Sequence, residues 1–149
     1  MYLKREVDGL ISGVSYTVSA TVNLATNAPL DSIGIGGSPG QSVYVKAGGS
    51  TTEPLAARDG TGHLRMDIDK GNQSRGGTQM AVLGVVGHPD IGGEEFRRKT
   101  LDSMDGAVVV AADEAGRAWL IVGTDSGCEG LTRLYYDRIS FTLTPVEPA

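Results

Sequence analysis

The chain has 149 residues and a formal net charge of −5 at pH 7. This length corresponds to one domain and is sufficient to bury roughly two thirds of the unfolded surface. No stretch approaches the roughly 20 apolar residues of a membrane-spanning helix, and no signal-peptide pattern opens the sequence. Nucleic acid is not an expected partner, because the densest basic run, Arg97-Arg98-Lys99, directly follows the acidic Glu94-Glu95.

Glycine punctuates the sequence, with 22 residues that cluster between apolar runs. Such punctuation is typical of turns in a many-stranded protein. The clearest strand covers residues 14–24, where apolar residues alternate with serine, threonine and asparagine. A period of two that includes β-branched residues predicts a strand with one buried face.

Further strands are expected at residues 2–7, 42–47, 63–69, 79–86, 107–112, 117–122 and 133–144. Residues 9–13 suggest a hairpin-type connection, and residues 113–116 a tight hairpin turn in which Gly116 takes a positive φ. Residues 91–104 fit either a short helix or an edge strand. Eight or nine short strands predict an all-β fold, an antiparallel two-sheet sandwich of the jelly-roll kind. We expect one domain over residues 1–149, lacking an N-terminal strand or segment because a strand pattern begins at once.

The last strand contains an acid on its apolar row. If Ile139, Phe141 and Leu143 face the core, strict alternation places Tyr135 and Asp137 on the same face. A carboxylate on a core-facing row is costly unless it is paired or bound to metal. Three outcomes are open: a β-bulge that turns the acid outward, a buried hydrogen-bonded or Arg-paired acid, or a cation ligand.

A second polar row follows from alternation in residues 63–69. If Leu64, Met66 and Ile68 face inward, the side chains of the outward row lie about 7 Å from one another, a spacing that suits contacts to an extended polar ligand. This row consists of His63, Arg65, Asp67 and Asp69. The alternative is an exposed face held by an Arg65–Asp67 pair. Together with the polar turn that follows, the candidate ligand-binding residues are His63, Arg65, Asp67, Asp69, Asn72, Gln73 and Arg75.

The loop over residues 123–130 supplies a candidate calcium site. Asp125 and Glu129 carry oxygen ligands that could join Asp137 around a structural Ca²⁺. Cys128 has no base placed beside it by the local sequence and is expected to be a buried structural thiol.

Several segments resemble known proteins, above all GTDSGCEGLTRLYYD over residues 123–137, together with GLISGVSYTVSATVNLATNAP and DKGNQSRGG. They resemble a group of uncharacterised bacterial secreted or lipoprotein-like proteins, which implies an extracytoplasmic location and a further N-terminal portion. The early and closing strands are also similar to those of galactose-binding-like carbohydrate-binding modules. In such modules the acid of the closing strand helps to hold a structural Ca²⁺, a role that the resemblance would give to Asp137.

Three functions are open. The first is a structural or interaction domain of the cell envelope or of a secreted protein, forming homo-oligomers through its sheet edges. The second is a non-catalytic carbohydrate-binding module with a polysaccharide partner, although Trp119 lies in a run apolar enough to be core. The third, the least favoured, is a glycoside hydrolase using a carboxylate pair. We expect a non-enzymatic protein whose partner is an envelope protein or a polysaccharide.

Overall fold

The structure is a computed structural model, and it describes residues 1–103 and 107–148. Within these ranges there are ten strands and no helix. All pairings between the strands are antiparallel. The strands are β1 (Tyr2–Val7), β2 (Ser15–Thr26), β3 (Val43–Ser50), β4 (Ala56–Arg58), β5 (Leu64–Met66), β6 (Met80–Val85), β7 (Arg97–Asp102), β8 (Val108–Ala111), β9 (Ala118–Ser126) and β10 (Leu134–Pro145).

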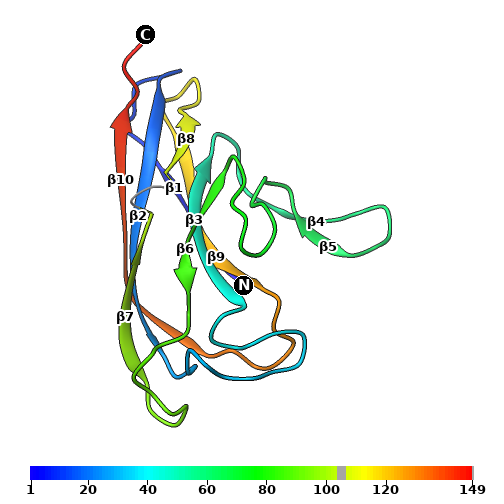
Figure 1. Cartoon of the computed structure of the whole chain (residues 1–149). Coiled ribbons are helices and arrows are strands. Elements are labelled where there is room, and N and C mark those ends of the chain that lie inside the picture. The colour runs from blue at the N-terminus through cyan, green and yellow to red at the C-terminus, as the bar shows by residue number, and fades with distance from the viewer. Residues whose placement is uncertain (104–106, 149) are drawn as a thin grey trace.

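Two sheets pack face to face as a β-sandwich, and a small two-stranded hairpin projects from it (Figure 1). Sheet A has the strand order β1-β9-β3-β6. Sheet B has the order β10-β2-β7, with β8 pairing to the same edge of β2 as β7. The hairpin β4–β5 lies beyond the outer face of sheet A. No helix in the described ranges is long and apolar enough to cross a membrane.

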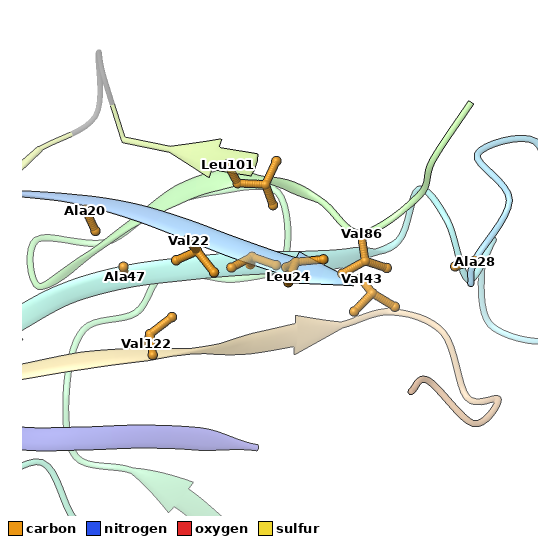
Figure 2. Packing of buried hydrophobic residues seen from close by; sticks show 10 residues of the cluster. Ala20, Val22, Leu24, Ala28, Val43, Ala47, Val86, Leu101 and Val122 are labelled. Atoms are coloured by element: carbon orange, nitrogen blue, oxygen red, sulfur yellow. The ribbon is translucent and has the colours of Figure 1, made fainter. Parts of the chain in front are cut away.

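The core lies between the two sheets and follows from the alternation in β2. Every second side chain of that strand is buried, and Val22 and Leu24 are completely inaccessible to solvent. They pack against Val43 and Val45 of β3 and against Val86 (Figure 2). Burial of such aliphatic side chains stabilises the fold by about 1.5–3 kcal/mol each. The predicted strand over residues 14–24 is therefore confirmed as the centre of sheet B.

Two connections differ from the expected hairpins because they cross between the sheets. Residues 9–13 join β1 in sheet A to β2 in sheet B, so no hairpin forms there. The turn at residues 113–116 is tight, with Gly116 at φ 72° and its amide donating to the Asp113 carbonyl at 3.0 Å. It also connects strands of opposite sheets, since β8 belongs to sheet B and β9 to sheet A.

Two strand predictions need correction in the middle of the chain. The strand expected over residues 63–69 is only Leu64–Met66, and it pairs with β4, which the sequence pattern did not indicate. Leu64 is 67% exposed and does not face the core. Between residues 91 and 104 the helix alternative is wrong, because the chain forms edge strand β7 beside β2. Met104 lies outside the described residues.

Candidate functional site

A buried lysine lies on the outer face of sheet A. Val43, Val45 and Ala47 point into the core from β3, so Lys46 points the other way, yet it is only 1% exposed. The segment between β5 and β6 covers it. Gly48, on the same outward row, permits this close cover, because a Cβ there would lie 1.9 Å from the Gln79 carbonyl oxygen.

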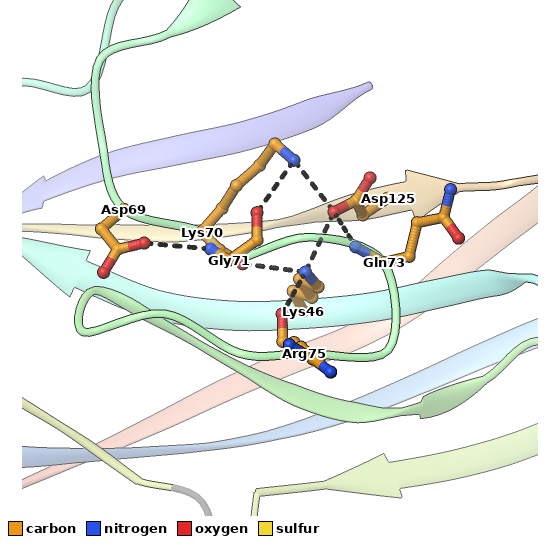
Figure 3. A network of polar contacts seen from close by, with 7 residues as sticks. All are labelled: Lys46, Asp69, Lys70, Gly71, Gln73, Arg75 and Asp125. Atoms are coloured by element: carbon orange, nitrogen blue, oxygen red, sulfur yellow. Dashed lines mark hydrogen bonds and ion pairs between the residues drawn. The ribbon is translucent and has the colours of Figure 1, made fainter.

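The Lys46 ammonium is fully satisfied by three acceptors, two from the loop between β5 and β6 and one from β9 (Figure 3). Its Nζ donates to the carbonyl oxygens of Lys70 at 2.8 Å and Arg75 at 2.9 Å, and to Oδ2 of Asp125 at 3.0 Å. An ammonium carries three N–H donors, so each has a partner. This saturation explains how a charge can remain in a buried position.

Asp125, on β9, connects the covering loop to sheet A. Its Oδ2 also accepts from Lys70 Nζ at 2.9 Å and from the backbone N–H of Gln73 at 2.8 Å. Burial alone would raise the pKa of Asp125, but the hydrogen bonds from Lys70, Lys46 and the Gln73 amide outweigh it and lower the pKa. Gln73 reaches this position with a φ of 47°, the only positive value for a non-glycine residue in the described chain. The carboxylate is therefore ionised near neutral pH and fixes the loop conformation.

A pocket of about 440 Å³ lies beside this network, between the β4–β5 hairpin and strands β1 and β9. Its walls combine apolar and charged side chains, and the Lys70 side chain is 36% exposed. A pocket with apolar walls and a few polar groups is a common form of small-molecule site. Its lining comprises Met1, Tyr2, Lys46, Leu64, Arg65, Met66, Ile68, Asp69, Lys70, Gly71, Met80, Gly123, Thr124 and Asp125.

The first predicted ligand-binding residues lie in and around the β4–β5 hairpin. Arg65 pairs with Asp59 and not with Asp67, which corrects the expected Arg65–Asp67 pair. The hydrogen bonds from Thr61 and Arg65 hold the pKa of Asp59 well below its usual range. The Asp59 carboxylate also accepts from the His63 backbone amide, and Asp67 accepts from the Leu55 amide at 2.8 Å. Side chains of the row expected to bind a ligand thus form hydrogen bonds and an ion pair within the hairpin region. Leu64, Met66 and Ile68, expected in the core, line the pocket instead.

The remaining predicted ligand-binding residues shape the covering loop. Asp69 accepts from the Thr78 amide and hydroxyl and from the Gly71 amide, which lowers its pKa. Asn72 and Arg75 exchange backbone hydrogen bonds at 3.0 Å, with Gln73 between them. Of the seven predicted residues, only Arg65 and Asp69 line the pocket.

The three candidate calcium ligands lie on different parts of the fold. Asp125 is on β9 of sheet A, Glu129 is exposed in the loop after β9, and Asp137 is on β10 of sheet B. Among residues 1–103 and 107–148, no three His, Cys, Asp or Glu side chains gather as a metal site requires. A calcium ion bound by Asp125, Glu129 and Asp137 remains a prediction. Cys128 is half-buried, and its sulfur accepts from the Gly130 amide at 3.3 Å.

Asp137 takes the first of the three outcomes left open by the sequence, a β-bulge. The register between β10 and β2 shifts between Tyr136 and Arg138, so Asp137 is the extra residue and is exposed. The bulge reverses the expected alternation upstream of it. Tyr136 packs on the core, where burial raises its pKa, and Tyr135 is 56% exposed and meets Phe96 edge to face.

A second candidate surface lies along β10, at the open side of the sandwich. Strand β10 pairs with β2 alone among the described strands, so its other edge is unpaired. A groove of about 360 Å³ separates it from β1, the edge strand of sheet A. The groove is mainly apolar and is lined by Leu3, Lys4, Arg5, Val7, Leu120, Ile121, Val122, Ile139 and Phe141.

Sequence reasoning missed both Lys46 and the free edge of β10. The one signal for Lys46 was a lone cation in the otherwise apolar and small run Val43–Ser50. Trp119, expected in the core, is half-buried on the outer face of sheet A, with the Lys4 ammonium 5.4 Å from its ring centre.

No protein-family model, curated protein or solved structure matches this chain.

Proposed function

We propose that this chain is a non-catalytic interaction domain that assembles by pairing β10 with β10 of a second copy. The free edge of β10 supports this proposal most strongly. The strand has 12 residues, and the stretch from Ile139 to Thr144 contains no charged residue and no proline. An edge stretch without charges or proline offers unpaired N–H and C=O groups to another strand.

The other sheet edges carry features that discourage strand pairing. Strand β1 has the charged run Lys4-Arg5-Glu6, and β7 has Arg97-Arg98-Lys99. Strand β8 has only 4 residues, and the β3–β6 ladder contains an irregularity beside Gly84. Charges, short length and bulges are the devices by which natural sheets block edge-to-edge association. The contrast favours β10 as the edge that receives a partner.

The apolar groove beneath β10 supports the same conclusion. Ile139 and Phe141 line it from sheet B, and Leu3, which is 50% exposed, lines it from β1. A strand added to β10 would continue sheet B over this opening and cover apolar side chains. Burial of apolar surface contributes about 25 cal/mol per Å² and would add to the backbone hydrogen bonds.

Light scattering across a range of protein concentrations tests the proposal. The wild-type chain should approach twice its mass of 15.5 kDa as concentration rises. The double variant Ser140→Lys, Thr142→Lys places two cations on the exposed row of the edge and should remain monomeric, because like charges on paired strands repel.

A second double variant provides the matched control. Ser12→Lys with Ser74→Lys adds the same charge at two exposed loop positions outside β10, and it should dimerise like the wild type. A wild-type chain that stays monomeric at the highest concentration contradicts the proposal. Equal dimerisation of both double variants would also contradict it.

The cellular setting rests on the sequence resemblance. Its similarity to secreted and lipoprotein-like proteins supports an extracytoplasmic location, where an envelope protein is a further expected partner. Five connections cross between the two sheets (β1–β2, β2–β3, β6–β7, β8–β9 and β9–β10), and these crossings support the finer assignment to the jelly-roll, galactose-binding-like type. Fractionation of cells that produce the full-length protein, with detection in the periplasm, the medium or the membrane-anchored fraction, tests the location.

A second candidate function is binding of a polysaccharide or another polar ligand in the pocket beside Lys46. The observation that favours it is the exposed Lys70 ammonium beside apolar walls that include Met66 and Met80. Calorimetric titration with neutral and acidic oligosaccharides tests this function. We expect binding that Lys70→Met weakens and that Arg98→Met, on the exposed edge of β7, leaves unchanged. Absence of heat with every saccharide would count against it.

A further inference from the structure

The bulge and the proline of β10 lie at equal distances from one residue in the middle of the strand. Asp137 interrupts the ladder at one end, and Pro145 has no N–H to donate at the other. The seven residues between them are centred on Phe141. We propose that β10 pairs antiparallel with β10 of a second copy about a two-fold axis at Phe141, so that the two B sheets become one continuous sheet.

The direction of the backbone groups follows from the existing ladder. Val146 N–H donates to the Ser15 carbonyl of β2 at 2.8 Å. In an antiparallel ladder the groups that face a given neighbour alternate along the strand. Even-numbered residues from 138 to 144 therefore bond to β2, and the N–H and C=O groups of Ile139, Phe141 and Leu143 point to the free edge. A two-fold axis at Phe141 lets the two Phe141 residues exchange both backbone hydrogen bonds.

The side chains suit this register on both faces. Toward the groove, Ile139 meets Leu143 of the second copy and Phe141 meets Phe141, which gives apolar and aromatic pairs. On the exposed face, Ser140 meets Thr142 and Arg138 meets Thr144. No pair of like charges lies opposite across the axis. A self-complementary surface of this kind is what a two-fold dimer requires, which favours a second copy over an unrelated strand.

Neighbouring registers fit less well. An axis at Ser140 places Asp137, the bulged residue, opposite Leu143. An axis at Thr142 places Pro145 opposite Ile139, whose free-edge carbonyl then has no N–H opposite it. Only the axis at Phe141 leaves both interruptions at the ends of the ladder. This register rests on the self-association proposed above and specifies its geometry.

Disulfide trapping between two singly substituted chains tests the register. The background is Cys128→Ala, which removes the native thiol, and the variants are Ser140→Cys and Thr142→Cys, both at exposed positions. In the proposed register these residues form a non-hydrogen-bonded pair with Cα atoms about 4.5 Å apart, within disulfide range. Two copies of Cys at 140, or two at 142, lie diagonally about 7–8 Å apart, which is too far.

Under mild oxidation, an equimolar mixture of the two variants should give at least about ten times more cross-linked dimer than either variant alone. Efficient cross-linking of the Ser140→Cys variant alone, or of Thr142→Cys alone, would shift the axis by one residue and overturn this register. Light scattering of the same samples separates the two proposals. A dimer that none of the cysteines traps overturns the register, and a monomer overturns the proposed function.

Discussion

The outer face of sheet A and the free edge of β10 differ in whether their polar groups have hydrogen-bond partners within the chain. On sheet A, the segment between β5 and β6 folds back over the strands and gives the Lys46 ammonium two of its three acceptors, and Asp125 of β9 is the third. Along β10, no described strand covers the edge, and its inner row lines an open apolar groove. The chain therefore satisfies its own polar groups on one side and presents unpaired ones on the other.

This difference indicates which region carries stability and which carries recognition. A buried charge network is strongly destabilised when one partner is lost, so the covering loop depends on Asp125. A solvated edge has little effect on the stability of the single chain, so β10 can be altered without unfolding it. Mutations in the covering loop should therefore lower the stability of the single chain, and mutations on the edge of β10 should change its self-association.

The largest effect should come from the core on which both regions depend. Leu24→Ala removes a fully buried side chain and should lower the free energy of unfolding by about 4 kcal/mol. Urea denaturation monitored by Trp119 fluorescence measures the change. Leu131→Ala, at a position 86% exposed, is the control and should change stability by less than about 0.5 kcal/mol. Similar losses in both variants would contradict the assignment of the core.

Asp125→Asn should have the next largest effect. It leaves the Lys46 ammonium buried without its carboxylate and should lower the free energy of unfolding by about 3 kcal/mol. Limited proteolysis should cut residues 67–79 faster in this variant. Asp113→Asn, in an exposed turn, is the control and should cost less than about 1 kcal/mol. Unchanged proteolysis of Asp125→Asn would show that the network does not hold the loop.

The same carboxylate predicts a smaller, pH-dependent effect. Because the pKa of Asp125 is lowered in the folded chain, its contribution is complete above the unfolded pKa of about 3.9 and is lost as pH falls through the folded value. The difference in Tm between the wild type and Asp125→Asn should therefore shrink below about pH 4. A constant difference from pH 7 to pH 3 would contradict this role. Other acids with lowered pKa, such as Asp69, are present in both proteins and cancel in the comparison.

The smallest effect on stability should come from a metal chelator. If Asp125, Glu129 and Asp137 hold calcium, dialysis against a chelator should lower Tm, and added Ca²⁺ should restore it. The Asp137→Asn variant should lose this response, whereas Asp102→Asn on β7 should retain it. A Tm that neither chelator nor calcium changes would count against the calcium prediction.

The sequence predicted the features that depend on the alternation of side chains within one strand. It did not predict the features that depend on contacts between distant parts of the chain. The regular pattern of β2 was sufficient, because that strand has one face in the core. The same rule failed at Tyr135, since one extra residue at Asp137 inverts every side chain upstream of it. Lys46 was not identified, because its burial depends on a loop about 24 to 29 residues further along the chain.

Amide hydrogen exchange along β10 tests the central claim most directly. The account predicts that the amides of Ile139, Phe141 and Leu143 exchange quickly in dilute protein and become protected as concentration rises. The amides of Ser140 and Thr142, which bond to β2, should be protected throughout. In the Ser140→Lys, Thr142→Lys variant the odd-numbered amides should stay fast at every concentration. Fast exchange at Phe141 in the concentrated wild-type protein would contradict pairing through this edge.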